Sequence, residues 1–146
     1  MATDTVVSVA QGPIAAVAPW REGLLVKVRF TGTAGHEQSV RQGAEALRQG
    51  QAYVVLEVYC QAEGPNCFRI EFLRGELPAL FDSRLFEVVD RGMHPSWVTS
   101  IEWDGSLTMA PAAWQAPDFW EGLMEHSPDA IEIYEAGRAS LMLGLE

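Results

Sequence analysis

Apolar and polar residues alternate in short segments through the first two thirds of the chain, a pattern that predicts β-strands. The first expected strand covers about residues 24–30 and ends at Gly32. Four further segments follow in quick succession, at about 51–60, 67–73, 79–81 and 85–90. Polar turn sequences separate these four and no helical pattern intervenes among them, so we expect an antiparallel sheet that curls into a small barrel.

A hairpin is predicted beyond Pro95. The segments 97–103 and 106–109 are separated by Asp104-Gly105, a pair that favours a tight turn because both central residues of a type I′ turn need a positive φ. The hairpin would add two more strands to the sheet.

A weaker helical pattern lies between the first two strands, in residues 34–50. Val40, Ala44 and Leu47 recur at helical spacing, and Gly50 can end a helix, whereas Gly43 weakens one. We predict one short helix or a long structured loop.

Two helices are predicted at the end of the chain. Asp118 followed by Glu121 resembles a capping box that starts the first one. The second begins at residues 127–129, where a serine N-cap, a first-turn proline and an acid follow one another. Its expected apolar side consists of four residues at helical spacing, with Ile133 at the edge: Ile131, Tyr134, Leu141 and Met142.

These elements predict an α+β fold in one domain that spans residues 1–146. The curled sheet would occupy about 24–109 and the helical extension about 112–143. A chain of 146 residues with 48% hydrophobic content is large enough to build one core without disulfides or a metal ion.

Acidic residues dominate the charge, and they are unevenly distributed. The formal net charge is -10, and from Ile101 onwards nine carboxylates stand against one cation, Arg138. This excess repels phosphate backbones and anionic lipid head groups, so nucleic acid and membranes are not expected partners. The N-terminus has an acid at Asp4 and no preceding base, and no apolar run approaches the roughly 18 to 20 residues that cross a bilayer. We therefore expect a cytoplasmic protein.

The two cysteines, Cys60 and Cys67, flank a loop and are expected to stay reduced. Strand alternation places Cys60 with Val58 on one sheet face and Cys67 with Arg69 on the other, so the thiols point apart. A reducing compartment favours the same result, with Cys60 as a small core residue.

No residue pattern indicates catalysis, a metal or a cofactor. The three histidines stand alone, without a second ligand at metal-binding spacing. The serines lack a glycine-flanked nucleophile turn, the cysteines lack an activating setting, and no phosphate-binding loop occurs. Carboxylate pairs are abundant, but an acidic chain contains them by chance, so an enzyme with a carboxylate site is only the third hypothesis.

Four tryptophans fall within the acidic C-terminal third or just before it. Trp97 and Trp120 have apolar neighbours and are expected to pack against the sheet. Trp103 and Trp114 lie in a turn and a loop-like segment, where each is either a core residue or an exposed anchor for a partner. The predicted partner-binding residues combine the second interpretation with nearby acids: Glu102, Trp103, Asp104, Trp114, Asp118, Glu121 and Glu125.

Several segments together resemble a group of small bacterial proteins. These are the stretch from VRFTGT through LRQGQAYVVLEV, the run from CFRIEF to HPSWV, and APDFWEGLMEHSPDAIEIYEAG, which lie within residues 28–137. The resemblance implies an SH3-like barrel with helical additions, in proteins that accompany polymorphic toxins as immunity partners. It carries no catalytic residue to this chain, because the matching positions are structural ones such as Gly50, Tyr53 and Trp97.

Our first functional hypothesis is therefore an immunity-type protein that binds a basic toxin domain through its acidic, tryptophan-rich surface. Flanking charge would accelerate the encounter, and exposed aromatic rings would hold the complex. The alternative is a non-catalytic adaptor or structural module of a bacterial cytoplasmic complex, which binds through an exposed sheet edge.

Overall fold

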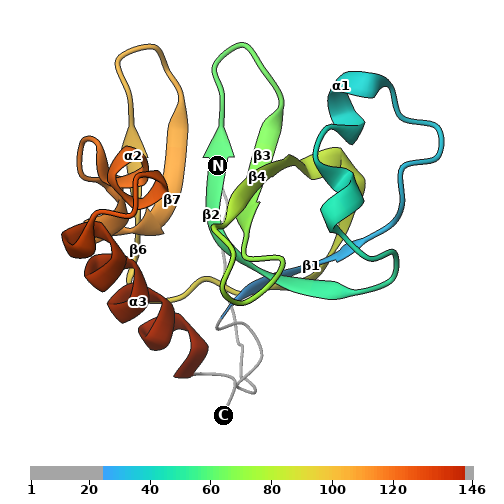
Figure 1. Cartoon of the computed structure of the whole chain (residues 1–146). Helices are drawn as coiled ribbons and strands as arrows, with labels where there is room; N and C mark the ends of the chain where they lie inside the picture. Colours follow the sequence, from blue (N-terminus) through green and yellow to red (C-terminus); the bar gives the residue numbers. More distant parts are fainter. Residues whose placement is uncertain (1–24, 144–146) are drawn as a thin grey trace, which may run out of the picture.

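The computed structural model describes residues 25–143 (Figure 1). Within this range three helices, three 3-10 turns and seven strands follow one another along the chain. The strands are β1 (Val26–Phe30), β2 (Ala52–Cys60), β3 (Asn66–Ile70), β4 (Ala79–Asp82), β5 (Phe86–Arg91), β6 (Trp97–Ile101) and β7 (Leu107–Pro111). The helical segments are α1 (Gln38–Arg41), η2 (Ala44–Ala46), η3 (Ser83–Leu85), η4 (Ala112–Gln115), α2 (Phe119–Met124) and α3 (Pro128–Met142).

The long strand β2 organises an antiparallel sheet. Along one edge it pairs with β3; along the other it pairs first with β1 and then, near its C-terminal end, with β7. The main strand order is β4-β3-β2-β1-β5, and the β6–β7 hairpin joins through β7 (Figure 1). The predicted α+β class with an antiparallel sheet is thus confirmed.

Closure of this sheet into a barrel is not confirmed. Among the described residues, no pairing joins the terminal strands β4, β5 and β6 to one another, so the sheet is open. The sheet does bend, because register shifts interrupt β1 between Lys27 and Val28 and β2 between Val55 and Glu57. The C-terminal residues of β2, from Val58 to Cys60, pair with β7, and this pairing attaches the β6–β7 hairpin to the sheet.

The segment after β1 forms two short helical turns rather than one helix. Gly43 separates α1 from η2 with a φ of 81°. A residue with left-handed φ cannot continue an α-helix, so Gly43, which was expected to weaken a helix here, ends it and divides the segment into two turns.

The β6–β7 hairpin is confirmed, but its turn differs from the predicted one. Glu102 N–H donates to Ser106 O at 2.8 Å, and Gly105 N–H donates to Glu102 O at 2.9 Å. Gly105 has a φ of 91°, whereas Asp104 keeps a negative φ. The loop therefore has three residues, 103–105, with glycine at its left-handed position, and not a two-residue type I′ turn.

The C-terminal helices hold Trp114 against the rest of the protein. Only 1% of this residue is exposed, and its ring stacks on Tyr134 with centroids 5.3 Å apart. Gly137 of α3 lies over the same indole, where a Cβ atom would come within 2.8 Å of the ring. Close packing of helix and ring thus depends on the absence of a side chain at residue 137.

The buried face of α3 overlaps the predicted face but is rotated about the helix axis relative to it. Tyr134 and Leu141 are buried as expected and Met142 is partly buried. Ala130 is buried in place of Ile131, which is 37% exposed. The sequence pattern selects bulky residues, whereas the structure buries the small ones, with Ala130 facing Gly122 of α2 and Gly137 facing the Trp114 ring.

The predicted helix starts are confirmed only in part. Pro128 occupies the first turn of α3 after Ser127, as expected, although the Ser127 side chain makes no capping bond. Asp118 precedes α2 with a left-handed φ of 66° and no side-chain capping bond. The capping-box prediction is therefore wrong, because this backbone turns Asp118 away from a capping geometry.

A buried carboxylate fastens α3 to the segment after β3. The side chain of Glu71 is 7% exposed; its two oxygens accept bonds from Tyr134 Oη and Arg138 Nε, each at 2.7 Å. Arg74 also reaches Glu71 and binds Glu135 at 2.6 Å. Helix and sheet are thus joined by charge-assisted bonds as well as by apolar packing.

One cluster of buried residues extends from the strands into α2 and α3. The prediction of a single domain stays a prediction, and such a shared core is what it requires. The expected absence of a secretory signal concerns the chain start, outside the described residues. None of the helices in residues 25–143 has the length and apolar character needed to span a bilayer.

The cysteine prediction is confirmed. Cys60 lies opposite Asn66 and Cys67 lies opposite Tyr59, so the two thiols point to different faces, and both are free. Burial raises the pKa of Cys67, which is the more buried thiol. Cys60 is only partly buried and packs against the core instead of lying within it.

We predict that Gly137→Ala destabilises the protein by about 1–3 kcal/mol, because the added methyl group must displace a packed indole ring. Gly122→Ala is the matched control, since Gly122 is also helical and a methyl group there would meet only Ala130 Cβ at 3.4 Å and Ser127 Cβ. Denaturant unfolding of both variants measures the difference. Equal stability of the two would contradict the proposed contact.

A second prediction concerns Tyr134. Burial and then its hydrogen bond to Glu71 raise the pKa of this phenol. A tyrosine in the unfolded chain ionises at about pH 10, whereas folded Tyr134 keeps its proton. The free energy of unfolding should therefore fall as the pH rises above that value. Tyr134→Phe should lose about 1.5 kcal/mol near neutral pH. It should also lack this alkaline loss, which urea unfolding across the two pH ranges will detect.

Candidate functional site

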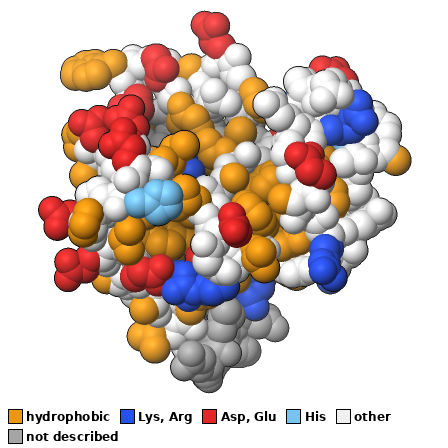
Figure 2. Space-filling model, in the orientation of Figure 1, with side chains coloured by type: hydrophobic (Ala, Val, Ile, Leu, Met, Phe, Trp, Pro, Cys, Tyr) orange, Lys and Arg blue, Asp and Glu red, His pale blue; other side chains and the backbone are white. Residues whose placement is uncertain are grey.

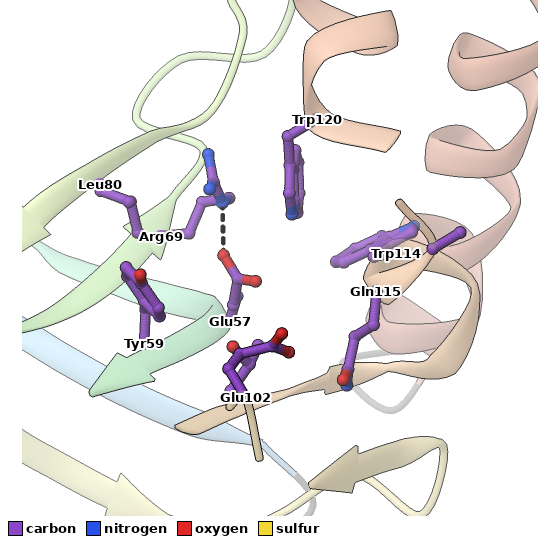
Figure 3. Close-up of a pocket in the computed structure, with 10 residues that line it drawn as sticks. Glu57, Tyr59, Arg69, Leu80, Glu102, Trp114, Gln115 and Trp120 are labelled. Carbon is purple, nitrogen blue, oxygen red and sulfur yellow. Dashed lines mark hydrogen bonds and ion pairs between the residues drawn. The ribbon is translucent and has the colours of Figure 1, made fainter. Parts of the chain in front are cut away.

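A cleft of about 340 Å³ lies between the sheet and the segment that leads into α2 (Figure 3). Its floor is one sheet face: Glu57 lies opposite Arg69, Arg69 opposite Leu80, and Tyr59 opposite both Cys67 and Thr108. Trp114, Gln115, Ala116 and Trp120 form one wall, and Glu102 from the β6–β7 turn also lines the cleft.

An ion pair and a tryptophan form the centre of the floor. Arg69 Nε donates to Glu57 Oε1 at 2.6 Å, and both side chains are largely buried, 13% and 6% exposed respectively. The Arg69 guanidinium lies 3.8 Å from the centroid of Trp120. The cation is therefore held on one side by a carboxylate and on another by an aromatic face.

Gln115 is fixed at the wall of the cleft. Its Nε2 donates to Val98 O and to Ala110 O, each at 2.8 Å, and so ties the wall to β6 and β7. Both amide hydrogens are used, which leaves Gln115 with no free donor. The indole Nε1 of Trp120 is also buried, without an acceptor among the described residues.

The structure gives the two ambiguous tryptophans opposite positions. Trp103 is 105% exposed at the tip of the hairpin, as a partner anchor requires. Trp114 is buried under α3, so it is not the exposed anchor that its predicted role in partner binding assumed. The reason is Gly137, which opens the space that the indole fills. Only the edge of Trp114 reaches the cleft (Figure 3).

The expected burial of Trp97 and Trp120 is largely correct. Trp97 is buried, and Trp120 is partly buried, with Phe119 beside it and its ring centroid 5.7 Å from that of Trp114.

The predicted acidic residues lie in two exposed groups. Glu102 and Asp104 flank Trp103 in the hairpin turn, while three acids belong to α2 and its flanks: Asp118, Glu121 and Glu125. None of these five forms an ion pair with a side chain in residues 25–143. Figure 2 shows acidic side chains gathered at the upper left, over α2, and basic ones toward the right and the bottom.

Local hydrogen bonds shift the pKa values of two of these acids in opposite directions. Bonds from the Ser106 backbone and hydroxyl lower the pKa of Asp104. A hydrogen bond to Asp118, and the charge of that neighbour, raise the pKa of Glu121. The hairpin thus keeps a firmly ionised acid beside Trp103, whereas the acids of α2 repel one another.

Several lining residues of the cleft are absent from the predicted site: Glu57, Tyr59, Arg69, Gln115 and Trp120. The sequence does carry one signal, since Glu57 and Arg69 are the charged residues of two successive strands that are otherwise rich in apolar residues. A charge within a buried strand needs a partner, so this pair was open to prediction. Nothing local indicates that residues 115–120 return to cover it.

Comparison with known proteins gives no relative: no family model, curated protein or solved structure matches this chain. Across residues 25–143, no three His, Cys, Asp or Glu side chains are grouped so that they could hold a metal ion.

We predict that Arg69→Met costs about 3–5 kcal/mol of unfolding free energy, because it leaves the Glu57 carboxylate buried without its cation. The double variant Glu57→Gln/Arg69→Met should regain at least about 1 kcal/mol relative to Arg69→Met. Arg29→Met is the control: Arg29 and Glu87 form an exposed pair, so the loss should stay below about 1 kcal/mol. Denaturant unfolding of the set tests the pair, and additive losses would contradict it.

Proposed function

We propose that this protein is a cytoplasmic, non-catalytic binding protein of the immunity type, which neutralises a basic toxin domain. The observation that carries the proposal is the β6–β7 turn, where a fully exposed tryptophan stands between two carboxylates that have no cationic partner in the described residues. An exposed tryptophan flanked by charge has the composition of an interface hot spot.

The hairpin tip is held in place before any partner binds. Ala62 N–H, in the loop between β2 and β3, donates to Ser106 Oγ at 3.2 Å, so the two neighbouring turns support each other (Figure 1). Asp104 accepts from Ser106 N–H at 2.8 Å. Pre-ordering of this kind reduces the conformational entropy lost on binding.

Charge supports a basic partner. Glu102 of the hairpin lines the cleft, and the segment that leads into the acidic helix α2 lines it as well. With a net charge of -10, the protein attracts a cationic domain from a distance, and rapid association is what neutralisation of a toxin needs. The proposed docking surface therefore comprises the hairpin tip, the cleft and α2, with the curled sheet as an SH3-like support.

The adaptor alternative is favoured by a different surface. Within residues 25–143, β5 pairs only with β1, and Val88 and Val89 on this outer strand are exposed. An edge strand of this kind can pair with another chain. A partner that docks on β5 and leaves the hairpin tip exposed would favour an adaptor.

We expect the chain to co-purify from its native host with a toxin domain that mass spectrometry identifies. Co-expression of that domain with the wild-type chain should restore growth of a bacterial host. Trp103→Ala should lose about 2 kcal/mol or more of binding free energy, mainly through faster dissociation, and should rescue growth poorly.

Leu73→Ala serves as the matched control, because Leu73 is also an exposed apolar side chain but lies in the loop after β3. It should bind and rescue as the wild type does, and both variants should keep the wild-type melting temperature. If Trp103→Ala binds the identified toxin with unchanged affinity, or if the captured partner is not toxic, the proposed function is wrong.

A further inference from the structure

The cleft beside the hairpin contains an unbalanced set of charges. Its lining includes two carboxylates, Glu57 and Glu102, and one cation, Arg69. Arg69 donates to Glu57 through Nε at 2.6 Å and stacks on Trp120, so the charge of this one cation is balanced by Glu57 and the charge of Glu102 is not balanced. The cleft as a whole therefore carries an excess negative charge and suits a second cation more than an anion.

Glu57 is the most informative residue of this set. Its side chain is 94% buried, yet Arg69 uses only the Oε1 atom, and no donor in residues 25–143 reaches Oε2. Figure 3 shows this second oxygen directed into the open part of the cleft, on the side of Glu102 and Trp114. Oε2 is not one of the fully buried polar atoms that lack a partner, so it is open to the space of the cleft, where a donor from a ligand can replace solvent.

The neighbouring groups do not supply that donor. Gln115 uses both amide hydrogens on backbone carbonyls, and the indole nitrogen of Trp120 is covered. Glu102 can only accept, because its carboxylate at the mouth of the cleft has no cationic partner among the described residues. Glu102 and Glu57 Oε2 therefore remain as ionised acceptors in the lining of the cleft.

We infer that the cleft receives a single arginine or lysine side chain, whose N–H groups bridge Glu102 at the mouth and Glu57 Oε2 on the floor. This inference rests on the proposed function, in which a basic domain docks on the hairpin, and it names the contact at that site. The aliphatic part of the inserted side chain would lie beside Tyr59, and the exposed Trp103 would remain free to pack on the surface around it.

The test uses the full-length protein and a small probe, so it needs no toxin. Nα-acetyl-arginine amide and Nα-acetyl-lysine amide are titrated while the indole N–H signals of Trp114 and Trp120 and the side-chain amide of Gln115 are followed by NMR. We expect saturable shifts with both probes. The neutral analogue Nα-acetyl-citrulline amide should bind at least about tenfold more weakly, because it lacks the charge that strengthens hydrogen bonds to carboxylates.

Glu102→Gln should weaken binding of the arginine probe roughly tenfold, since it removes the exposed carboxylate without touching the buried ion pair. Glu132→Gln makes the same change in net charge on an exposed residue of α3 and should bind as the wild type does. The inference is overturned if citrulline amide binds equally well, if Glu102→Gln binds like Glu132→Gln, or if no saturable shift occurs.

Probe binding to the cleft can succeed or fail independently of the proposed immunity role. Charge-dependent binding of the probe, together with a native partner that is not a toxin, would retain the cationic contact and remove the immunity role. A confirmed toxin partner, together with a cleft that ignores the probe, would retain the role and remove this contact.

Discussion

The contact between Trp114 and Gly137 is the constraint on which the arrangement of the C-terminal third depends. Because residue 137 has no side chain, α3 lies directly over the indole, and this ring of η4 is buried beneath the helix. The position of Trp114 fixes the segment 115–120 that follows it, including Gln115, which binds β6 and β7, and Trp120, which stacks on Arg69. A packing requirement in a helix thus sets the wall of the candidate binding cleft.

The charges of the protein serve two separate purposes. Glu71, Arg74, Glu135 and Arg138 pair with one another and attach α3 to the sheet, so part of the acidic excess is used within the fold. The acids of the hairpin and of α2 have no cationic partner in the described residues and remain available to the solvent. The net charge of the chain does not separate these groups, since a paired and an unpaired glutamate contribute equally to it.

The cleft combines a buried, ordered floor with an exposed rim. The Glu57–Arg69 pair is largely buried, and the guanidinium lies against Trp120. A buried pair of this kind adds little net stability, but it holds its two side chains in one geometry. Glu102 and Trp103 at the rim are exposed and can meet a partner first. Long-range attraction, an aromatic anchor and a polar recess therefore lie within one continuous surface, as the immunity-type proposal requires.

The sequence by itself determined the strands, the hairpin near Asp104-Gly105, the separation of the two thiols and the presence of two C-terminal helices. Each follows from alternation, turn chemistry or helical spacing within a few residues. Only the tertiary structure decided that the sheet stays open, that Trp114 is buried while Trp103 is exposed, and that Glu57, Arg69 and Trp120 meet. Both tryptophans lie in turn or loop-like segments, and local pattern cannot separate them, because burial of Trp114 depends on a glycine 23 residues away. Long-range packing of this kind has no periodic signature in the chain.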